Sequence, residues 1–345
     1  MSSTNSRDEL EAIRKDASSP GDKRVIKELR EAGSKTARER LIGLLDEGSL
    51  VEIDAFVKHR SGDHGMHVHT PLGDGVVAGH GKIDGRRVVS FSQDFSVFAG
   101  TMGEMHAKKI TKVVEFAEKA SLPIVGIWDG DGQRAHEGVT SLGSTGELLD
   151  ALVSCSGKVP LISMVLGTVS GTSALAAGIS DFVILGNKRG RMFMRSPYSI
   201  PEIIDGEIDE ETLGGAVQHA SRSGIACMVS NSEEEAFDMV AEILAYLPDH
   251  TMSEAPVIST GDRWDRKCKG IRKLVPEDSD SPYDIREVFN HVFDEGRFLE
   301  LFSSYAENIV IGFARLDGYS VGVIGNQPSV LAGCLDIDAS VSYTH

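Results

Sequence analysis

An internal repeat is the feature of this sequence that most constrains its fold. The segment LLDEGSLVEI, residues 44–53, recurs as VFDEGRFLEL, residues 292–301. Two further matches, HGKIDG with FARLDG and SVFAG with SVLAG, share one offset, because 313 − 80 and 329 − 96 both equal 233. Turns that are alike by chance would not keep both their order and their spacing. The repeat therefore predicts two homologous units in one chain.

The pattern of strands and helices divides the chain into four parts. Residues 1–33 are predicted to be an N-terminal helical extension, of which residues 1–20 are polar and expected to be frayed. Residues 34–250 form the first unit, where apolar strands such as PIVGIWD, PLISMVLG and DFVILG alternate with helices, as in a buried sheet that helices cover. Residues 251–283 are predicted to be a linker, and residues 284–345 the start of the second unit. Compared with the first unit, the second is expected to lack the helix, strands and glycine loop that should follow SVLAG.

Composition narrows the class of protein. The chain carries 35 Lys and Arg against 52 Asp and Glu, a net charge of −17, which disfavours nucleic acid as a partner. The four cysteines form no C-x-x-C pair, so neither a disulfide framework nor a zinc ribbon is predicted. The N-terminus lacks signal-peptide features, and no apolar run approaches the length of a membrane span. We therefore expect a soluble, cytoplasmic protein that does not bind membranes.

Local patterns predict individual elements of the first unit. The alternation in LVEIDAF predicts a strand over residues 50–56, and Asp84-Gly85 predicts a hairpin turn. The most informative segment is LISMVLGTVSGTSALAAGISDFVIL, where a buried strand is expected to run into a turn, Gly167 to Thr172, that opens a helix. The N–H groups of Gly171 and Thr172 would then point outward and stabilise a thioester oxygen as it becomes an enolate. The alternative is a tight turn that only packs against the sheet.

Two more glycine-rich loops follow predicted strands. Residues 98–104, FAGTMGE, lead from a strand into a helix, and residues 129–138, DGDGQRAHEG, follow a buried strand. Ligands of α/β folds bind at such strand ends. The sequence contains no G-x-x-x-x-G-K-[ST] and no strand-linked G-x-G-x-x-G motif, so neither nucleotide hydrolysis nor dinucleotide binding is predicted.

Histidines and serines give weaker signals. His59, His64, His67 and His69 crowd one loop, but their spacing matches no metal motif, so an exposed polar loop is favoured over a zinc site and no metal site is predicted. His219 is expected to be a structural hydrogen-bonding residue rather than a general base. Three serines lack the context of a nucleophile elbow, which argues against a serine hydrolase: Ser170, Ser173 and Ser223.

A set of longer stretches carries a family resemblance. They are TARERLIGLLDEGSLVEIDAFVKHR, GDGVVAGHGKIDGR, FSQDFSVFAGTMGEMHAKKI, EGVTSLGSTGE, DEETLGGAVQHASRSGIA, PYDIREVF, YAENIVIGFARLDG and GNQPSVLAGCLDIDAS. Together they resemble the carboxyltransferase (beta) subunits of biotin-dependent acyl-CoA carboxylases, propionyl-CoA carboxylase in particular, from about Lys35 to Ser340. The resemblance implies an α/β, crotonase-like fold, a ββα superhelix with one complete domain and the start of a second.

The resemblance also implies a reaction and partners. In such enzymes the first domain holds acyl-CoA and the second holds carboxybiotin, which a separate biotin-carboxylase and biotin-carrier alpha subunit delivers to a homo-oligomer. Carboxybiotin releases CO₂, the biotin enolate takes the acyl α proton, and the acyl enolate captures CO₂. Backbone N–H groups hold both enolates, so no charged side chain is required. No tightly bound cofactor is expected in this chain.

The resemblance assigns roles residue by residue. Gly171 and Thr172 match the family's Gly-Gly pair and are the predicted catalytic residues. The family reads close to GPCAGGA where this chain has GTVSGTS, so Thr172 adds a side chain where substrate should approach. It reads DSGGARIQEG where this chain has DGDGQRAHEG, so Asp131 places a negative charge near the oxyanion. The predicted substrate-binding residues are Gly100, Thr101, Gly132, Gly167 and Ser170, with Lys35 and Arg38 as candidate contacts for the CoA phosphates.

We therefore expect a carboxyltransferase subunit that transfers CO₂ from carboxybiotin to the α carbon of a short-chain acyl-CoA, with propionyl-CoA favoured. Because the second unit is expected to be incomplete, the chain alone is predicted not to carboxylate. The alternative is a non-catalytic subunit that binds acyl-CoA or assembles with a full-length beta chain, which the altered glycine loops favour. A crotonase-like decarboxylase or hydrolase is a third hypothesis, but no convincing acid or base supports it.

Overall fold

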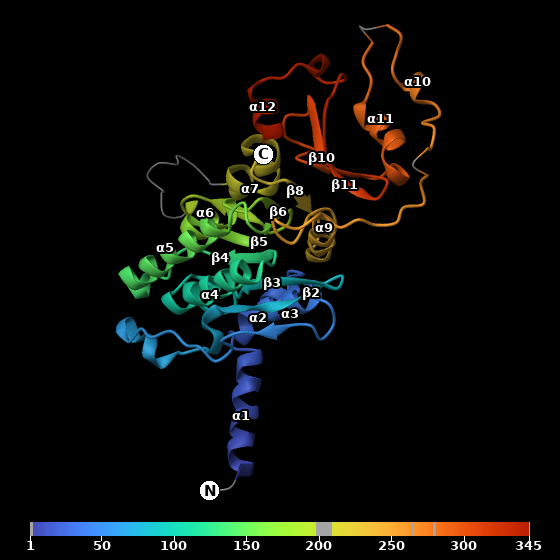
Figure 1. Ribbon diagram of the computed structural model, residues 1–345. Coiled ribbons are helices and arrows are strands. Elements are labelled where there is room, and N and C mark those ends of the chain that lie inside the picture. The colour runs from blue at the N-terminus through green and yellow to red at the C-terminus, as the bar shows by residue number, and fades with distance from the viewer. Residues whose placement is uncertain (1–2, 198–208, 264, 279–280, 345) are drawn as a thin grey trace.

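The structure is a computed structural model that describes residues 3–197, 209–263, 265–278 and 281–344. Figure 1 shows three parts along the chain: a projecting N-terminal helix, a central body of sheet and helices, and a smaller body built from the C-terminal segments. No helix in the described ranges is long and apolar enough to cross a membrane.

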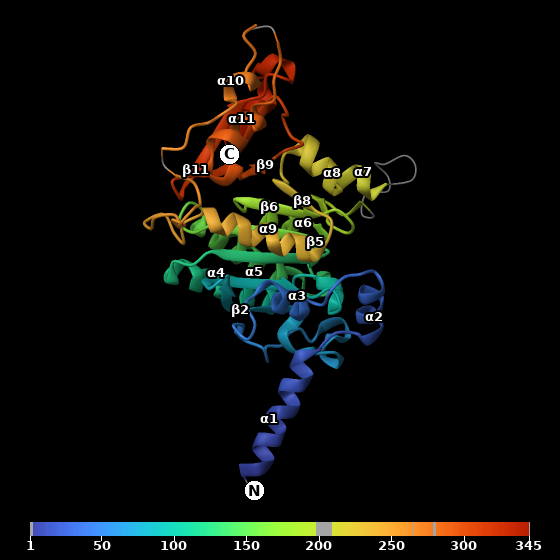
Figure 2. The same ribbon diagram turned by 90° about the vertical axis from the view of Figure 1, so that its right-hand side faces the viewer.

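Two helices precede the first unit. α1 spans Ser3–Ser18 and α2 spans Lys23–Glu31. The prediction that residues 1–20 are frayed is therefore wrong for most of that segment. α1 contains neither Gly nor Pro, and Arg7 and Glu11, one turn apart, form an ion pair of 3.4 Å on its surface. α1 projects from the body in both ribbon views (Figures 1 and 2).

The first unit contains an eight-stranded sheet in the order β1-β2-β3-β4-β5-β6-β8, with β7 paired to β5. β1, β2 and β3 pair antiparallel, and the predicted hairpin turn at Asp84-Gly85 joins β2 to β3. From β3 onward all pairs are parallel, so the carboxyl ends of these strands share one edge. β1 is shorter than predicted because Asp54 takes a φ of 55° just after it. The strands are β1 (Val51–Glu52), β2 (Val76–Ile83), β3 (Arg86–Gln93), β4 (Ile124–Gly130), β5 (Leu161–Ser170), β6 (Phe182–Gly186), β7 (Arg191–Phe193) and β8 (Met228–Ser230).

Helices cover both faces of this sheet (Figure 2). α3 (Ala37–Leu44) and α9 (Glu233–Tyr246) bury their apolar residues in one core. α4 (Glu104–Ala120), α5 (Gly138–Cys155) and α6 (Gly171–Gly178) bury theirs in a second core on the opposite face. A capping box of Thr36 and Glu39 begins α3.

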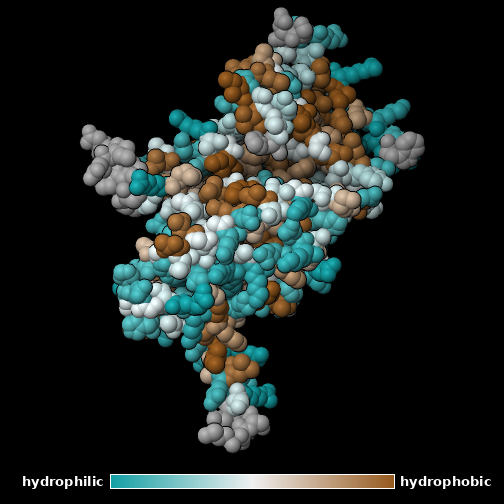
Figure 3. All heavy atoms as spheres, turned by 60° about the vertical axis from the view of Figure 1, so that its left-hand side comes forward, coloured by the Kyte–Doolittle hydropathy of each residue, from teal (hydrophilic) through white to brown (hydrophobic). Residues whose placement is uncertain are grey.

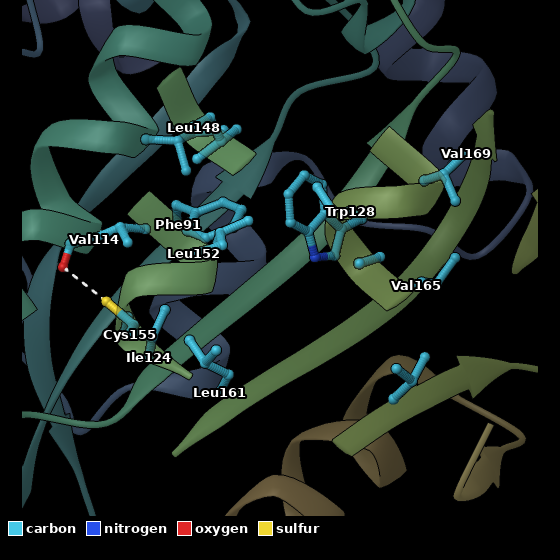
Figure 4. Packing of buried hydrophobic residues seen from close by; sticks show 14 of the residues in the cluster. Phe91, Val114, Ile124, Trp128, Leu148, Leu152, Cys155, Leu161, Val165 and Val169 are labelled. Atoms are coloured by element: carbon cyan, nitrogen blue, oxygen red, sulfur yellow. Dashed lines mark hydrogen bonds between the residues drawn. The ribbon is translucent and has the colours of Figure 1, made fainter. Parts of the chain in front are cut away.

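Strand β4 shows why the apolar runs are continuous. Trp128 belongs to the core beneath α4 and α5, whereas Val125 and Ile127 belong to the core beneath α3 and α9. Successive side chains of a strand point to opposite faces, so a strand covered on both sides needs apolar residues throughout. The rings of Phe91 and Trp128 pack edge to face with centroids 5.0 Å apart, near Leu148 of α5 (Figure 4).

The internal repeat is present in the backbone as well as in the sequence. The hairpin strands β10 (Ile309–Leu316) and β11 (Tyr319–Asn326) begin and end 233 residues after β2 and β3. The loop that follows is repeated too. Residues 98 and 99 have φ values of 49° and 53°, and residues 331 and 332 have the same two values.

The repeat continues further than the sequence suggested. α12 (Ile337–Thr344) begins 233 residues after the first residue of α4, Glu104. The expectation that the second unit lacks the helix after SVLAG is therefore wrong. Its sequence, IDASVSYT, is rich in Asp, Ser and Thr, which are weak helix formers, so the helix gives little signal in the sequence.

Aromatic side chains join the second unit to the first. β9 (Phe298–Leu301), β10 and β11 form a separate antiparallel sheet. Phe313 of β10 stacks on Tyr246 of α9 and lies tilted against Phe182 of β6, with ring centroids 5.9 and 6.2 Å apart. The second unit therefore docks at the β6 and β8 end of the central sheet, over the end of α9.

The segment between the units packs partly against the second hairpin. Arg315 donates a hydrogen bond of 2.8 Å to the carbonyl of Pro256, and the Ile258 N–H donates one of 3.2 Å to the carbonyl of Gly318. The predicted boundaries of the linker, 251–283, stay a prediction. The remaining helices are α7 (Glu210–Gly214), α8 (Ala216–Gln218), a π-helical turn (His219–Ser223), α10 (Ile271–Leu274) and α11 (Ile285–Val292).

We predict that Phe313→Ala loosens the second unit from the first. The change removes a half-buried ring from Phe182 and Tyr246 at a cost of about 1–3 kcal/mol. Limited proteolysis should then cut within residues 251–283 several-fold faster than in the wild type. Phe116→Ala on α4, whose ring is also partly exposed and makes no contact between the units, is the control. Equal cleavage rates for Phe313→Ala and the wild type would show that this ring does not hold the units together.

Candidate functional site

Three glycine-rich loops meet at the carboxyl edge of the sheet. The loop after β3 lies beside the loop after β4, where the Met102 N–H donates to the Gly132 carbonyl at 2.8 Å and the Arg134 N–H donates to the Met102 carbonyl at 3.0 Å. The loop after β4 in turn contacts the end of β5, because Ser170 Oγ donates to Asp131 Oδ1 at 2.6 Å. Parallel strands bring such segments together although they lie far apart in the sequence. The structure thus joins the three loops that the sequence singles out.

The turn expected from Gly167 is wrong. β5 continues as a strand through Ser170, because β7 pairs with residues 168–170, and α6 begins at Gly171. Gly171 has a φ of 55°, in the left-handed region that favours glycine. Ser170, the N-cap, makes no capping hydrogen bond. The first-turn N–H groups of α6, which include those of Gly171 and Thr172, therefore have no side-chain cap.

Two polar pairs connect the loop after β4 to the start of α6. Gln133 Nε2 donates to Thr172 Oγ1 at 2.7 Å, beside the bond from Ser170 to Asp131. All four residues stand where the patterns GPCAGGA and DSGGARIQEG have Gly or Ala. The polar side chains that differ from the family pattern therefore interact in pairs. Each one in the loop after β4 forms a hydrogen bond with one at the end of β5 or the start of α6.

Close packing accounts for two of the glycines predicted to bind substrate. A Cβ at Gly100 would lie 2.1 Å from the carbonyl oxygen of Asp129, and a Cβ at Gly167 would lie 1.8 Å from Asp129 Oδ1. Neither position has room for a side chain. Gly132 has a φ of 71°, and its Cβ would lie 3.1 Å from Ser170 Oγ. Substrate contact by these glycines stays a prediction.

The two basic residues predicted to meet CoA phosphates each contact a carboxylate, and their contact with CoA stays a prediction. Lys35 pairs with Glu234, and Arg38 pairs with Glu52 at 2.6 Å. Both lie at the start of α3, and the structure does not bring their charged groups to the glycine loops. A phosphate would have to compete with these carboxylates for either residue.

A buried ion triad ties the loop after β4 to two helices. Arg40 of α3 is 1% exposed and donates to Asp129 and Glu233, each at 2.8 Å. Asp129 lies near the end of β4, and Glu233 begins α9. Burial opposes the charge of Arg40, but the two carboxylates outweigh it and raise its pKa. This triad was not predicted from the sequence, although Arg40 lies on the buried face of α3 between Ala37 and Leu44.

A second buried network holds the same loop through Arg134. Its guanidinium is 1% exposed and donates to Asp74 at 2.6 Å, to Glu137 at 2.8 Å and to the carbonyl of Thr101 at 2.9 Å. It also lies over the Phe98 ring, 4.7 Å from the centroid. Thr101, predicted to bind substrate, thus contributes its backbone to this network. Burial raises the pKa of Asp74, and the Arg134 charge offsets only part of that increase.

His106 lies in this network as a neutral ring. Its Nδ1 lies 3.0 Å from the Asp74 carbonyl and its Nε2 lies 3.2 Å from the Gln93 amide nitrogen. A ring that donates through Nδ1 and accepts through Nε2 satisfies both contacts. Burial lowers its pKa to about 3, and the positive charges of Arg134 and Lys109 act in the same direction.

His59 and His219 make ordinary hydrogen bonds. His59 Nε2 lies 2.8 Å from the His69 carbonyl. His219 contacts the Met192 carbonyl through Nε2 at 3.0 Å and Ser223 Oγ through Nδ1 at 2.8 Å. Within the part of the chain that the structure describes, no group of three or more His, Cys, Asp or Glu residues is placed to hold a metal ion.

Comparison with known proteins gives the family. The Carboxyl transferase domain family matches residues 28–345. The methylmalonyl-CoA decarboxylase subunit alpha of Veillonella parvula is 42% identical over 320 residues, which cover 93% of this chain and 63% of the relative. The propionyl-CoA carboxylase beta chain of Saccharopolyspora erythraea is 42% identical over 328 residues, which cover 93% of this chain and 60% of the relative. A crystal structure of transcarboxylase 12S, a hexamer with methylmalonyl-coenzyme A bound, superposes with a TM-score of 0.95 at 35% identity, covering 99% of this chain and 66% of that chain.

The chain belongs to the carboxyl transferase domain family. This confirms the resemblance drawn from its sequence, and the likeness to transcarboxylase 12S confirms the crotonase-like fold class. The chain spans between 60% and 63% of the length of the two curated relatives.

We predict that Arg40→Met destabilises the protein by about 3–5 kcal/mol, because it leaves two buried carboxylates without a counter-charge. Urea denaturation measures the loss as a lower midpoint. Arg38→Met is the matched control, since the Arg38–Glu52 pair is partly exposed and should be worth no more than about 1 kcal/mol. Equal costs for the two variants would contradict a structural role for the triad.

We predict that His106 makes the protein sensitive to acid. Its pKa falls from an ordinary 6.5 to about 3 on folding, so below pH 6.5 the unfolded chain binds a proton that the folded chain does not. The stabilising contribution is complete above pH 6.5 and decreases as the pH falls toward 3, by about 1.4 kcal/mol per unit. Urea midpoints measured between pH 7 and 5 should decline less steeply in His106→Asn than in the wild type. The exposed His136→Asn should keep the wild-type slope, and an unchanged slope in His106→Asn would show that the folded protein already protonates this ring.

Proposed function

We propose that this chain supplies the acyl-CoA site of a biotin-dependent carboxyltransferase. The observation that carries the proposal is the convergence of three glycine-rich loops at the uncapped start of α6. Uncapped N–H groups at a helix N-terminus are suited to an oxyanion. The names of relatives in the family support an acyl-CoA of the propionyl or methylmalonyl class as substrate.

The proposed role of the chain is to hold negative charge with its backbone. As the α proton leaves the acyl group, the thioester oxygen becomes an enolate oxygen, and the N–H groups of Gly171 and Thr172 would donate to it. Each such donor contributes about 3–4 kcal/mol in comparable sites. Carboxybiotin, delivered by a separate alpha subunit, supplies the CO₂ and the base when bound. The described residues of the second unit include the glycine loop 331–333 but no counterpart of the loop after β4, so we assign no residue to biotin.

The two polar pairs restrict the acyl group that fits. The Thr172 side chain and its bond to Gln133 occupy space beside the donors, which favours a short acyl chain. The Asp131 carboxylate accepts from Ser170 and disfavours a second negative charge nearby. A small, neutral acyl group such as propionyl is therefore the proposed substrate.

A non-catalytic subunit that binds acyl-CoA is the second candidate. It is favoured by the same two features, the Thr172 side chain at the donors and the Asp131 charge beside them, because both weaken stabilisation of an enolate. Assembly with the alpha subunit and with further copies of this chain belongs to either proposal, and transcarboxylase 12S is itself a hexamer. Because no residue of this chain is assigned to biotin, the chain alone should form no product under either candidate. An assay with propionyl-CoA, bicarbonate, ATP and the biotin-carboxylase and biotin-carrier alpha subunit separates the two when a source of the biotin half of a beta chain is added, since only the first candidate then forms product.

We predict that propionyl-CoA binds the purified chain and that Thr172→Gly binds it about three- to tenfold more tightly, because the change exposes the two N–H groups. Isothermal titration calorimetry measures both affinities. Thr172→Ser keeps the hydroxyl that meets Gln133 and should bind like the wild type. If neither variant nor the wild type binds propionyl-CoA, the proposed acyl-CoA site is wrong.

A further inference from the structure

A cavity of about 60 Å³ lies at the carboxyl ends of β6 and β8, beside the start of α9. Residues 32–34, between α2 and α3, also line it. Apolar side chains gather over the upper body of the molecule, where the second unit lies (Figure 3), but most of the residues that line this cavity are polar. Two of them, Asn187 and Lys188, are exposed, so the cavity opens to solvent.

Three of the residues that line this cavity carry a buried polar atom without a hydrogen-bond partner. Among the described residues, none contacts Ser230 Oγ, Arg189 Nη1 or Glu233 Oε2 by a hydrogen bond. Ser230 is 0% exposed and Glu233 is 8% exposed. Buried polar atoms nearly always have a partner, so three such atoms around one cavity indicate a polar occupant.

Two of these atoms belong to groups of opposite charge. Arg189 forms no ion pair in the part of the chain that the structure describes, and its guanidinium lies 5.9 Å from the centroid of the Phe95 ring. Glu233 uses only one oxygen, since Oε1 accepts from Arg40 at 2.8 Å while Oε2 is left without a donor. A guanidinium that lacks an anion and a carboxylate oxygen that lacks a donor favour an occupant with both charges.

We propose that this cavity binds a small zwitterion of the α-amino-acid class, such as glycine or alanine. The carboxylate of the ligand accepts from Arg189, and its ammonium group donates to Glu233 Oε2. The Ser230 hydroxyl, which can donate or accept, bonds either group. The size agrees, because one water molecule needs about 10–15 Å³ and the cavity has room for several, enough for an amino acid with a small side chain.

The proposed ligand would also be connected to the buried ion triad. Arg40 joins Glu233 to Asp129, so an occupant bonded to Glu233 completes the hydrogen bonds of a group that holds α3, β4 and α9 together. Because the cavity exists only in the folded protein, its occupant should raise the melting temperature. The site is separate from the proposed acyl-CoA site and does not depend on it.

The test is isothermal titration calorimetry of the purified chain with glycine, and with acetate and methylamine, which each carry only one of its charges. We expect glycine to bind at least tenfold more tightly than either, because only glycine meets both Arg189 and Glu233. Arg189→Met should weaken glycine binding about tenfold or more. Arg87→Met is the matched control, because Arg87 is exposed, does not line the cavity and should leave the affinity unchanged.

Two serine variants separate a ligand contact from a structural one. Ser230→Ala should weaken glycine binding about three- to tenfold without lowering the melting temperature of the free protein, because its hydroxyl has no partner to lose. Ser90 is equally buried, but its Oγ donates to the Val125 carbonyl at 2.9 Å. Ser90→Ala should therefore lower the melting temperature and leave the affinity for glycine unchanged.

Each outcome decides the proposal. Circular dichroism of Arg189→Met should match the wild type, since this side chain has no ion pair to lose among the described residues. Absence of glycine binding to the wild type would show that water alone fills the cavity and would overturn the proposal. So would acetate that binds as tightly as glycine, or equal affinities of Arg189→Met and the wild type. None of these readouts requires acyl-CoA, so failure here is distinct from failure of the proposed function.

Discussion

Burial of one carboxylate, that of Asp129, determines how the candidate site is assembled. Its side chain is held by Arg40, which Glu233 also engages, so α3, β4 and α9 are joined at one point. Its backbone N–H donates to Gln93 at 3.1 Å, which links the neighbouring strand. A buried charge that lost its partner would cost several kcal/mol, so these elements are constrained to one arrangement. This packing explains why residues 100 and 167 are glycines. The backbone at each position approaches Asp129 so closely that a side chain would not fit.

Contacts within the protein, rather than contacts with substrate, hold the glycine-rich loops in place. Arg134 fixes the loop after β4 from one end and Asp129 fixes it from the other. Between them, Asp131 and Gln133 cross to Ser170 and Thr172. A backbone oxyanion site depends on such fixed geometry, since its donors contribute most when they need no rearrangement. These two hydrogen-bonded pairs hold the loop after β4 against the start of α6, and they place polar side chains where the family has small ones. They therefore change the side chains that line the site, while the backbone around it stays fixed.

The sequence predicts features that depend on local pattern and misses those that depend on distant neighbours. The apolar strands, the hairpin and the 233-residue repeat were predicted correctly, because periodicity and turn chemistry are local. The extension of β5 to Ser170 was missed because pairing with β7 causes it. The burial of Arg40 and Arg134 was also missed, because their partners lie on other elements, although the position of Arg40 on the apolar face of α3 was a usable signal. Substrate contacts of the glycine loops stay predictions for the same reason.

The glycine loop occurs twice in the chain, in two different surroundings. Comparing the two copies shows how far the local sequence alone determines the backbone conformation of the loop. Residues 98–100 have φ values of 49°, 53° and 66°, and residues 331–333 have 49°, 53° and 69°. In the first copy the loop packs against the backbone of Asp129, whereas in the second the nearest atoms to Gly333 belong to its own hairpin and turn, at 3.3 Å or more. The loop therefore adopts its conformation from its own sequence, SVFAG or SVLAG, without a neighbouring β4.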